Sequence, residues 1–361
     1  MATKLDQYRL LGRSGLRVSP LSLGAMTFGV GSGGSWGSSD EEAAAIVNTY
    51  VEAGGNFIDT ANFYSMGRSE EVLAPLIAPH RDSLVLSTKY TLTMKQGDPN
   101  ASGNHRKNMI QSVEGSLRRL KTDAIDLFYL HKWDFRTGVD EVMRGLDDLV
   151  RAGKIHYAAI SDTPAWQIAR MQTIADLRGW APFVALQIEY NLTERTGERD
   201  MLPMAEELGL GVCPYSPLGA GMLTGKYSRA DMAPSGEIDF TSRKGQVIAG
   251  GRLTERNFDI ADVVAEVAKE LGCKPGHVAM AWAMRHRAVV SPLIGARTLE
   301  QFQDNLGALD VAFDDDQLRR LEEVSAIEKG VPHDNITSNA VPFMYGFVDV
   351  EWRDGAEPYG R

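Results

Sequence analysis

The sequence predicts an α/β fold, a (β/α)8 TIM barrel with an N-terminal β-hairpin cap and a long C-terminal tail. Short apolar runs alternate eight times with segments of helical periodicity, and no change in composition interrupts them. Most runs are nearly continuous in Val, Ile, Leu, Phe and Ala, as is typical of parallel strands buried on both faces. Eight strand–helix units favour closure into a barrel over an open sheet. We expect one domain over residues 1–361, with the barrel at about 17–310 and the tail at 328–361.

Eight strands are predicted from these runs. In chain order they lie at residues 18–23, 56–59, 84–89, 125–131, 157–161, 184–187, 211–215 and 289–294. Ahead of them, residues 8–18 contain the turn signal Arg13-Ser14-Gly15, which predicts the hairpin. Two stretches lack clear periodicity: residues 228–254, which are rich in Gly and Ser, and the tail from Glu328 onward.

Helix start and stop signals lie between the predicted strands. Residues 39–42 read Ser-Asp-Glu-Glu, a capping box, and apolar residues spaced for one helix face follow them. Pro275 stands where the first turn of a helix accepts proline, and Gly272 marks the end of the preceding helix. These signals place helices between the strands, as the barrel requires.

The composition disfavours several classes of protein. A formal net charge of -10, with no run of Lys and Arg to offset it, disfavours a nucleic-acid partner. No apolar stretch approaches the ~20 residues that span a bilayer, and the first residues lack the apolar core of a signal peptide, so we expect a cytoplasmic location. Cys213 and Cys273 are expected to be small buried side chains, not a disulfide. The histidines show no metal-binding spacing, so we expect no metal site.

Polar side chains end the predicted strands, on the face where such barrels build their active sites. From the second strand to the eighth, the strands end in or near Asp59, Lys89, His131, Ser161-Asp162, Gln187, Tyr215-Ser216 and Gly295-Ala296-Arg297. One charged residue at a strand end says little. Seven successive strands that end in polar or aromatic groups predict one shared site.

The chemistry of four of these residues fits together. Tyr64 lies five residues after Asp59, on the loop that reaches over the strand ends. A phenol has a pKa of about 10, too high for fast proton donation at neutral pH, and a nearby Lys89 ammonium would lower that pKa. Asp59 can pair with Lys89, and His131 can orient a substrate oxygen. The set suits reduction of a carbonyl: Tyr64 gives the proton, and a nicotinamide cofactor gives the hydride that no side chain supplies.

Five motifs in chain order then give the sequence a family resemblance. Residues 55–61, Gly-Asn-Phe-Ile-Asp-Thr-Ala, followed by Tyr64, Gly67 and Glu70, resemble the signature of the aldo-keto reductases. The likeness continues with Ser87-Thr88-Lys89, residues 126–131 (Asp-Leu-Phe-Tyr-Leu-His), residues 214–218 (Pro-Tyr-Ser-Pro-Leu), and Gly295-Ala296-Arg297 with Gln301 and Asn305. It covers nearly the whole chain, to about Leu309, and is to bacterial-type NADPH-dependent members of the superfamily.

The resemblance implies a catalytic group and a cofactor site. The catalytic residues would be Asp59, Tyr64, Lys89 and His131. Ser161 and Gln187 would hold the carboxamide of the nicotinamide, and Tyr215 would stack on its ring. The pyrophosphate would be surrounded by Ser216, Leu218, Gly219 and Gly221, with Lys226 nearby. The adenosine end would lie at Gly295, with Arg297 facing the 2′-phosphate and Gln301 and Asn305 facing the adenine.

Several assignments have alternatives. The family commonly has Asn where this chain has Asp162, and an ionised carboxylate cannot donate a hydrogen bond, so the role of Asp162 is open. Residues 298–301 form a capping-box pattern, so Gln301 has a purely structural alternative to cofactor contact. Trp133 is a wall of the substrate pocket or a packed loop aromatic; we favour the pocket, to which we also assign Phe28. The tail around residues 342–347 lines the pocket, which we favour, or docks on outer helices or on a second subunit.

The leading interpretation is an NADPH-dependent oxidoreductase that reduces a small aldehyde or ketone to the alcohol, with homo-oligomerisation left open. A second interpretation is a cofactor-binding, redox-sensing interaction subunit of the same fold, for which an intact catalytic set would have no use. A third is a Rossmann-type dehydrogenase, because residues 29–34 match its Gly-x-Gly-x-x-Gly pattern. The next strand ends too far along, at Asp59, to supply the acidic residue that this pattern needs.

Overall fold

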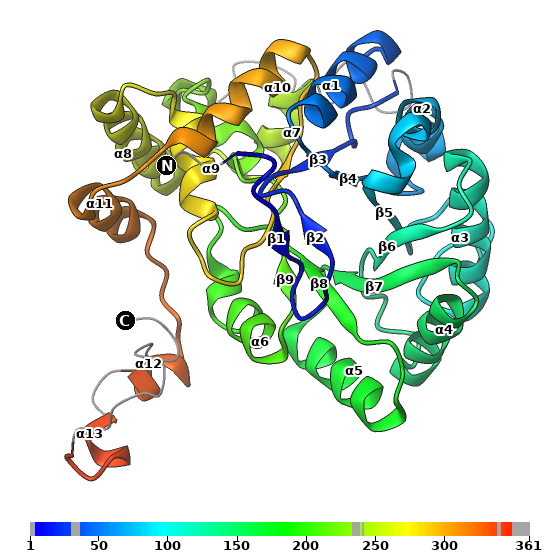
Figure 1. The fold of residues 1–361 in the computed structure, drawn as a ribbon. Coiled ribbons are helices and arrows are strands. Elements are labelled where there is room, and N and C mark those ends of the chain that lie inside the picture. The colour runs from blue at the N-terminus through cyan, green and yellow to red at the C-terminus, as the bar shows by residue number, and fades with distance from the viewer. Residues whose placement is uncertain (1–3, 30–36, 233–238, 240–241, 338–340, 349–361) are drawn as a thin grey trace.

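The computed structural model describes residues 4–29, 37–232, 239, 242–337 and 341–348. Its centre is a sheet of eight parallel strands in the order β10-β3-β4-β5-β6-β7-β8-β9. The strands are β3 (Ser22–Gly24), β4 (Phe57–Asp59), β5 (Val85–Tyr90), β6 (Ile125–Leu130), β7 (Ile155–Ser161), β8 (Phe183–Gln187), β9 (Gly211–Val212) and β10 (Leu293–Ile294). Figure 1 shows the sheet curled at the centre of the molecule with helices around it.

Backbone hydrogen bonds close the sheet into the predicted barrel. β10 pairs with β3 at one edge. At the other edge, the Val212 N–H donates to the Ala288 carbonyl at 2.8 Å, and the Val290 N–H donates to the Val212 carbonyl at 2.8 Å. Residues 288–290 lead directly into β10, so these bonds join β9 to the segment that carries the last strand.

The predicted hairpin covers the amino ends of the barrel strands. β1 (Arg9–Leu10) and β2 (Arg17–Val18) pair antiparallel. Leu11 and Val18 are fully buried against the bottom of the barrel. Gly12 has φ +58°, and a Cβ there would lie 2.5 Å from the carbonyl oxygens of Val184 and Gly209, so glycine is required for this close approach. Val18 therefore belongs to the hairpin, and the first barrel strand begins at Ser22, not at residue 18 as predicted.

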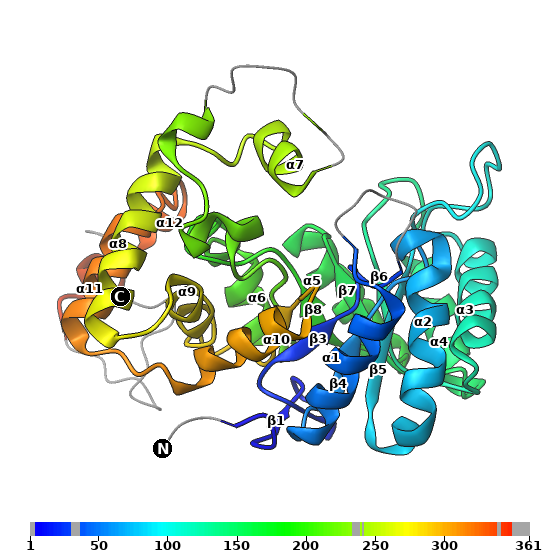
Figure 2. The same ribbon diagram turned by 90° about the horizontal axis from the view of Figure 1, so that it is seen from above.

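Helices surround the strands. They are α1 (Asp40–Glu52), α2 (Arg68–Ile77), α3 (Arg106–Leu120), α4 (Val139–Arg151), α5 (Ala165–Arg178), α6 (Met201–Leu208), α8 (Glu255–Leu271), α9 (Pro275–Ala283), α10 (Leu299–Asn305) and α11 (Asp315–Ser325). Short 3-10 helices are η1 (Tyr64–Gly67), η2 (Ala78–Ser83), η3 (Thr196–Glu198), η4 (Gly219–Thr224), η5 (Arg229–Met232) and η6 (Leu306–Asp310). Figure 2 shows α2, α3 and α4 on one side of the barrel and α8, α9 and α11 on the other.

Only one of the two hydrogen bonds of the capping box predicted at residues 39–42 is formed. The Ser39 side chain accepts a hydrogen bond from the Glu42 N–H and caps α1. The Glu42 carboxylate, however, accepts from the Leu299 N–H at 2.7 Å instead of returning to Ser39. The carboxylate therefore connects α1 to the start of α10, a tertiary contact that a local pattern cannot specify.

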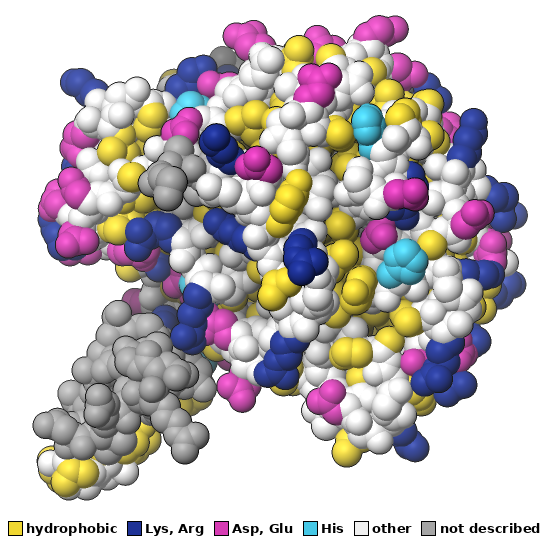
Figure 3. Space-filling view, in the orientation of Figure 1, with side chains coloured by type: hydrophobic (Ala, Val, Ile, Leu, Met, Phe, Trp, Pro, Cys, Tyr) yellow, Lys and Arg dark blue, Asp and Glu magenta, His cyan; other side chains and the backbone are white. Residues whose placement is uncertain are grey.

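The core lies between the sheet and the helices, with a smaller cluster inside the barrel. Tyr129 and Cys213 belong to the inner cluster and are fully buried. Cys273 is half-buried on the outer side, and both cysteines are free thiols, as predicted. Over the face shown in Figure 3, basic and acidic side chains are interspersed. No helix within the described residues is long and apolar enough to cross a membrane.

Two regions differ from the predictions. Residues 228–254, predicted to be irregular, contain α7 (Arg243–Ala249), which Ser242 caps by accepting from the Gly245 N–H. Figure 2 shows α7 on the side of the barrel opposite the hairpin. The glycine-rich stretch from residue 30 to 36 lies outside the described residues.

The described parts of the tail, residues 328–337 and 341–348, do not line the barrel's open end, contrary to the expectation. α12 (His333–Thr337) and α13 (Val341–Met344) lie outside the ring of helices (Figure 1). The Arg199 guanidinium donates to the Glu328 carbonyl and holds the start of the tail near α6. Phe343 and Phe347 are 73% and 71% exposed and pack edge to face on each other. The two rings are therefore not buried against the described surface of the barrel. Trp352 lies outside the described residues.

Candidate active site

The four predicted catalytic residues meet at the carboxyl ends of β4, β5 and β6, the mouth of the barrel. Asp59 ends β4, Lys89 lies near the end of β5, and His131 directly follows β6. Tyr64 begins η1, five residues beyond Asp59. Asp59 and Lys89 are 1% and 0% exposed, so both charges are withdrawn from water and each requires a partner.

The Lys89 ammonium has an acceptor for each of its three protons. It donates to the Asp59 carboxylate, to the Thr60 carbonyl at 2.9 Å and to the Tyr64 hydroxyl at 3.2 Å. A lysine side chain has three donors and no acceptor, so this set satisfies it completely. The arrangement fixes the position of the ammonium beside the phenol.

Burial and charge oppose each other in the pKa values of this group. Burial alone would lower the pKa of Lys89, but the charge of Asp59 and the contact with Tyr64 raise it above its usual value, so the ammonium stays charged. Burial raises the pKa of Tyr64, while the Lys89 ammonium acts in the opposite direction. The expectation that Lys89 brings the pKa of Tyr64 below its usual value is therefore wrong for this structure, because burial of the phenol outweighs the ammonium.

His131 is held in its neutral form. Burial, followed by the charges of Lys89 and Lys132, keeps its pKa well below the usual value. Its ring lies edge to face with the Tyr64 ring, with centroids 5.8 Å apart. The Nδ1 atom is buried and has no hydrogen-bond partner among the described residues. A neutral imidazole carries one N–H, so His131 can offer a single donor to a substrate oxygen beside Tyr64.

Two side chains that support Asp59 were not identified from the sequence in that role. Ser87 Oγ donates to Asp59 Oδ1 at 2.7 Å, and Gln187 Nε2 donates to the same oxygen at 3.2 Å. Ser87 lies two residues before Lys89 in β5, so both side chains point to the same face of the strand. That alternation was the available signal for Ser87. In this structure Gln187 contacts the Asp59 carboxylate, whereas its contact with a nicotinamide carboxamide remains a prediction.

The ends of β6, β7 and β9 are joined by Asp162. The Tyr215 hydroxyl donates to Asp162 Oδ1 at 3.1 Å, and Lys132 Nζ lies 3.1 Å from Asp162 Oδ2. Ser161, which ends β7, is 1% exposed. The three predicted cofactor residues Ser161, Gln187 and Tyr215 thus come from successive strand ends at one side of the mouth.

The loop after β9 has the backbone of a turn that can receive an anion. Ser216, Gly219 and Gly221 have φ of +53°, +55° and +93°. A Cβ at Gly221 would lie only 2.4 Å from Lys226 Nζ, so the absence of a side chain lets the ammonium lie against the loop backbone. A cation beside a glycine turn fits the pyrophosphate of a dinucleotide. Leu218 packs partly buried against the core next to this turn.

A second loop, after β8, holds this turn in place. Asn191 Nδ2 donates to the Ser216 carbonyl at 3.0 Å, while Asn191 Oδ1 accepts from the backbone N–H groups of Thr193 and Glu194. Asn191 is fully buried. It therefore connects the two loops through one amide side chain, a role that nothing in the sequence pattern indicated.

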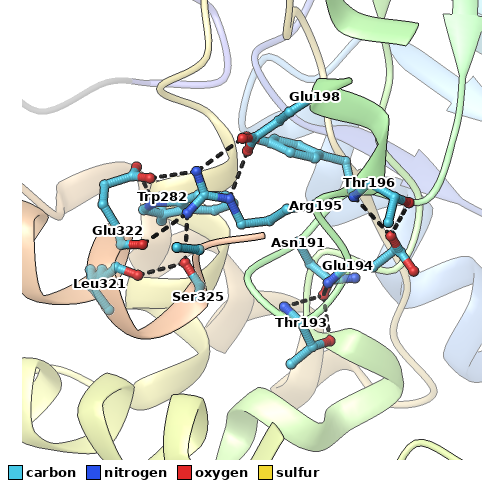
Figure 4. Close-up of polar contacts among 12 residues, drawn as sticks. Asn191, Thr193, Glu194, Arg195, Thr196, Glu198, Trp282, Leu321, Glu322 and Ser325 are labelled. Carbon is cyan, nitrogen blue, oxygen red and sulfur yellow. Dashed lines mark hydrogen bonds and ion pairs between the residues drawn. The ribbon is translucent and has the colours of Figure 1, made fainter. Parts of the chain in front are cut away.

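Arg195 anchors the loop that carries Asn191 (Figure 4). Its guanidinium pairs with Glu198 at 2.7 Å and with Glu322 at 2.6 Å, and donates to Ser325 Oγ at 2.7 Å. Its charge also lies 5.0 Å from the centroid of the Trp282 ring. These contacts fasten the loop after β8 to α9 and α11, far along the chain.

The predicted adenosine end lies at the start of α10. Gln301 Oε1 accepts from the Arg297 N–H at 3.0 Å, and Thr298 Oγ1 accepts from the Gln301 N–H. Gln301 therefore makes contacts of the capping type. Its side-chain oxygen, however, accepts from the Arg297 N–H and not from the Thr298 N–H. Asn305 Nδ2 donates to the Gly295 carbonyl at 3.3 Å. The Arg297 side chain is exposed, and within the described ranges its guanidinium has no hydrogen-bond or ion-pair partner.

A cavity of about 670 Å³ lies beside the mouth, between the segments that follow β5 and β6. Its walls include Thr91, His105, Lys132, Trp133, Asp134 and Arg136. Trp133 is 7% exposed and stands edge to face with Phe135, so the predicted pocket wall borders a cavity. Phe28 is fully buried in the cluster beneath α1, so its side chain presents no surface to this cavity. No group of residues suited to a metal ion occurs in the part of the chain that the structure describes.

Comparisons with known proteins show which family the chain resembles. The sequence profile described as "Aldo/keto reductase family" matches residues 20–326. The chain is 38% identical to norsolorinic acid reductase of Aspergillus flavus, over 91% of this chain and 84% of that protein. It is 36% identical to aryl-alcohol dehydrogenase [NADP(+)] of Phanerodontia chrysosporium, over 92% of this chain and 89% of that protein. It is 34% identical to aldo-keto reductase ausK of Aspergillus calidoustus, over 92% and 86%.

Proposed function

The chain belongs to the aldo/keto reductase family, and we propose that it is an NADPH-dependent enzyme that reduces an aldehyde or ketone to the alcohol with Tyr64 as proton donor. The observation that carries this proposal is the contact of one ammonium, that of Lys89, with both Asp59 and the Tyr64 hydroxyl. Binding of a cofactor alone does not require a buried ammonium, such as that of Lys89, in contact with a phenol. Residues 1–361 would act as one catalytic domain.

The chain's own residues supply proton donation and charge stabilisation. His131, neutral because of its lowered pKa, donates to the carbonyl oxygen and orients it beside Tyr64. Tyr64 transfers its hydroxyl proton to that oxygen as the alcohol forms. The Lys89 ammonium stabilises the phenolate that remains, and Asp59 keeps Lys89 charged. Ser87 and Gln187 hold the Asp59 carboxylate in place.

The residues at the mouth fit a nicotinamide dinucleotide. The bound cofactor would supply the hydride. Ser161 and Tyr215 would hold its nicotinamide end, the glycine turn with Lys226 its pyrophosphate, and the region around Gly295 and Asn305 its adenine. The guanidinium of Arg297, which has no partner within the described part of the chain, suits the 2′-phosphate that distinguishes NADPH from NADH. One relative's name specifies NADP(+), which supports the same choice.

We propose an aromatic carbonyl compound as the substrate class, because the aromatic side chain of Trp133 borders the cavity. A volume of about 670 Å³ is within the usual range for pockets that hold drug-sized ligands. Trp133 supplies an aromatic wall one residue beyond Lys132, near the catalytic His131. His105 accepts from the Asn108 N–H through Nδ1, so its proton is on Nε2, and neither that group nor Trp133 Nε1 has an acceptor within the described structure. The relatives named for norsolorinic acid and aryl alcohols point to aromatic substrates as well.

The direct test is oxidation of NADPH, followed at its near-ultraviolet absorbance, with matched aromatic and aliphatic aldehydes and ketones. We expect turnover with the aromatic set, and higher kcat/KM there than with aliphatic compounds of equal size. Binding of NADPH without turnover of any carbonyl compound would favour the interaction-subunit alternative. A chain that binds neither NADPH nor NADH would exclude both functions.

A further inference from the structure

Asp162 joins three strand ends across the mouth of the barrel. One carboxylate oxygen accepts from the Tyr215 hydroxyl at 3.1 Å, and the other lies 3.1 Å from Lys132 Nζ. The Asp162 carbonyl also accepts from the Trp133 N–H at 3.3 Å. The side chain and the backbone of this one residue therefore contact the segment after β6, and the side chain reaches the end of β9 as well.

The backbone of Asp162 is held in an unfavourable conformation. Its φ is +33°, on the left-handed side that side chains with a Cβ rarely adopt. Such conformations persist where surrounding contacts impose them, and they gather at binding and catalytic sites. Here the imposed conformation directs the carboxylate toward Tyr215, which lies 53 residues further along the chain.

The Tyr215 ring is fixed at both ends. The Tyr215 N–H donates to the Ile188 carbonyl at 2.8 Å, and Glu189 forms a parallel bridge with Tyr215, so its backbone is part of the sheet edge. At the other end, the hydroxyl is tied to Asp162. With the backbone and the phenol oxygen both held, the position and the long axis of the ring are set before any ligand arrives.

Charge explains why a carboxylate can serve here. An ionised carboxylate accepts strongly from a phenol, and its second oxygen is compensated by the Lys132 ammonium. The groups that face Tyr215 include a second ion pair, Glu189 with Arg252. Asp162 and Lys132 are 26% and 54% exposed in their side chains, so water also screens the pair. The Asp162 carboxylate thus has a cationic partner, Lys132, without a ligand.

We propose that Asp162 is a positioning residue: it holds the Tyr215 ring at the position where it stacks on the nicotinamide, and Lys132 is its counter-ion. The inference rests on the proposed function, since it requires a nicotinamide cofactor. It gives a role to the carboxylate that stands where the amide of an asparagine is usual. In this role an asparagine would also accept from Tyr215, so the replacement conserves the tether while it changes the charge.

Binding experiments test the hydrogen bond between Tyr215 and Asp162, the tether of the Tyr215 ring, without catalysis. NADP+ affinity is measured by quenching of tryptophan fluorescence in Asp162→Ala, Asp162→Asn, Tyr215→Phe and the Asp162→Ala/Tyr215→Phe double variant. Adenosine 2′,5′-bisphosphate, which lacks the nicotinamide, is the second probe. We expect Asp162→Ala and Tyr215→Phe each to weaken NADP+ binding about tenfold, as for loss of a hydrogen bond to a charged group. The double variant should be no weaker than either single variant, because both remove the same bond.

Three further results separate this role from a general structural one. The affinity for adenosine 2′,5′-bisphosphate should stay within about twofold of wild type, since that probe does not reach Tyr215. Asp162→Asn should restore most of the NADP+ affinity. Asp148→Ala removes a carboxylate of similar exposure, 28%, that pairs with Arg106 away from the mouth, and it should leave both affinities unchanged.

Other outcomes would overturn the inference. Wild-type NADP+ affinity in Asp162→Ala, additive losses in the double variant, or a parallel loss of bisphosphate binding would each remove the tether as the explanation. Failure of Asp162→Asn to restore affinity would indicate that the carboxylate contacts the cofactor itself. A wild-type chain that binds neither probe would overturn the proposed function together with the inference, whereas wild-type binding with an unaffected Asp162→Ala would overturn the inference alone.

Discussion

The ammonium nitrogen of Lys89 lies 3.2 Å from the phenolic oxygen of Tyr64 and donates a hydrogen bond to it. Because an ammonium cannot accept, Tyr64 is the acceptor in this contact and its own proton is directed elsewhere. The neutral ring of His131 lies on the same side, with its centroid 5.8 Å from that of Tyr64. Tyr64 is thus oriented as a donor toward the space above the strand ends, where the proposed reaction would take place.

Tyr64→Phe removes the proton and keeps the ring. We expect kcat to fall by about 10²–10⁴-fold, the usual contribution of a general acid, with NADPH affinity unchanged. Tyr157→Phe, a substitution of the same kind in β7, is the control and should leave kcat unaltered. Near wild-type turnover by Tyr64→Phe would remove Tyr64 as the acid.

The lowered pKa of His131 predicts the acidic side of the pH profile. A histidine of ordinary pKa takes up a proton as the pH falls through about 6.5. Burial and two lysine charges lower the pKa of His131, so it remains neutral as the pH falls through that value and charges only further down. We expect kcat/KM for an uncharged aldehyde to stay level between about pH 8 and pH 6. A fall centred near pH 6.5 that is absent from His131→Gln would contradict the neutral assignment.

Arg297 is expected to set the cofactor preference. Arg297→Ala should weaken NADPH binding by at least about tenfold and leave NADH binding nearly unchanged, because only NADPH carries the 2′-phosphate. Dissociation constants measured by fluorescence titration give both numbers. Arg170→Ala, an exposed arginine on α5, is the control. Equal wild-type affinities for the two cofactors would count against this role of Arg297.

Arg195 is expected to be a major source of stability for the loop beside the cofactor turn. Arg195→Met should lower the free energy of unfolding by about 2–3 kcal/mol, less than the roughly 3–5 kcal/mol of a fully buried pair, because the Glu322 side chain is 47% exposed. Urea denaturation measures this change. Arg319→Met removes an exposed arginine that also pairs with two carboxylates, and it should cost less than about 1 kcal/mol. Equal effects of the two substitutions would show that the Arg195 contacts add no more stability than the exposed ion pairs of Arg319.

Removal of the chain after Lys329 should leave the kinetics unaltered. The tail helices lie away from the mouth, and Phe343 and Phe347 are largely exposed and are not among the residues that line the cavity beside Trp133. We expect KM and kcat for an aromatic aldehyde to stay within about twofold of the full chain. A raised KM with intact NADPH binding would show that the tail reaches the pocket in solution.

The barrel and the meeting of Asp59, Lys89 and His131 could be predicted from the sequence because both depend on local order. Apolar runs mark the strands, and a residue at the end of a parallel strand must lie at the mouth whatever the details of packing. Asp59, Lys89 and His131 could therefore be placed together before any contact was known. Val18 could not be assigned correctly, since an apolar residue before a strand is equally consistent with a hairpin or with the strand itself.

The features that sequence reasoning missed depend on contacts between distant segments. In the sequence Glu42 completes a capping pattern, but in the structure its carboxylate accepts from the Leu299 N–H at the start of another helix, α10. The sequence does not distinguish Asn191 from other polar residues, because its contact with the Ser216 carbonyl forms only in the folded chain. The pKa of Tyr64 was misjudged for the same reason: the charge of Lys89 could be inferred from position, whereas the burial that outweighs it depends on packing of the whole site.

The narrow closure of the barrel has a consequence for its dynamics. β9 and β10 have two residues each, and the amides of Val212, Val290 and Leu293 donate the bonds that join the two edges. Neighbouring pairs such as β6 and β7 share five aligned residue pairs. Local opening follows the least-bonded edge, so hydrogen exchange at Val212 and Val290 should be faster than in β6. The turn that begins at Ser216 continues from this edge. A ligand bound at the turn would therefore slow hydrogen exchange at Val212 and Val290, and this slowing would show whether the ligand is bound.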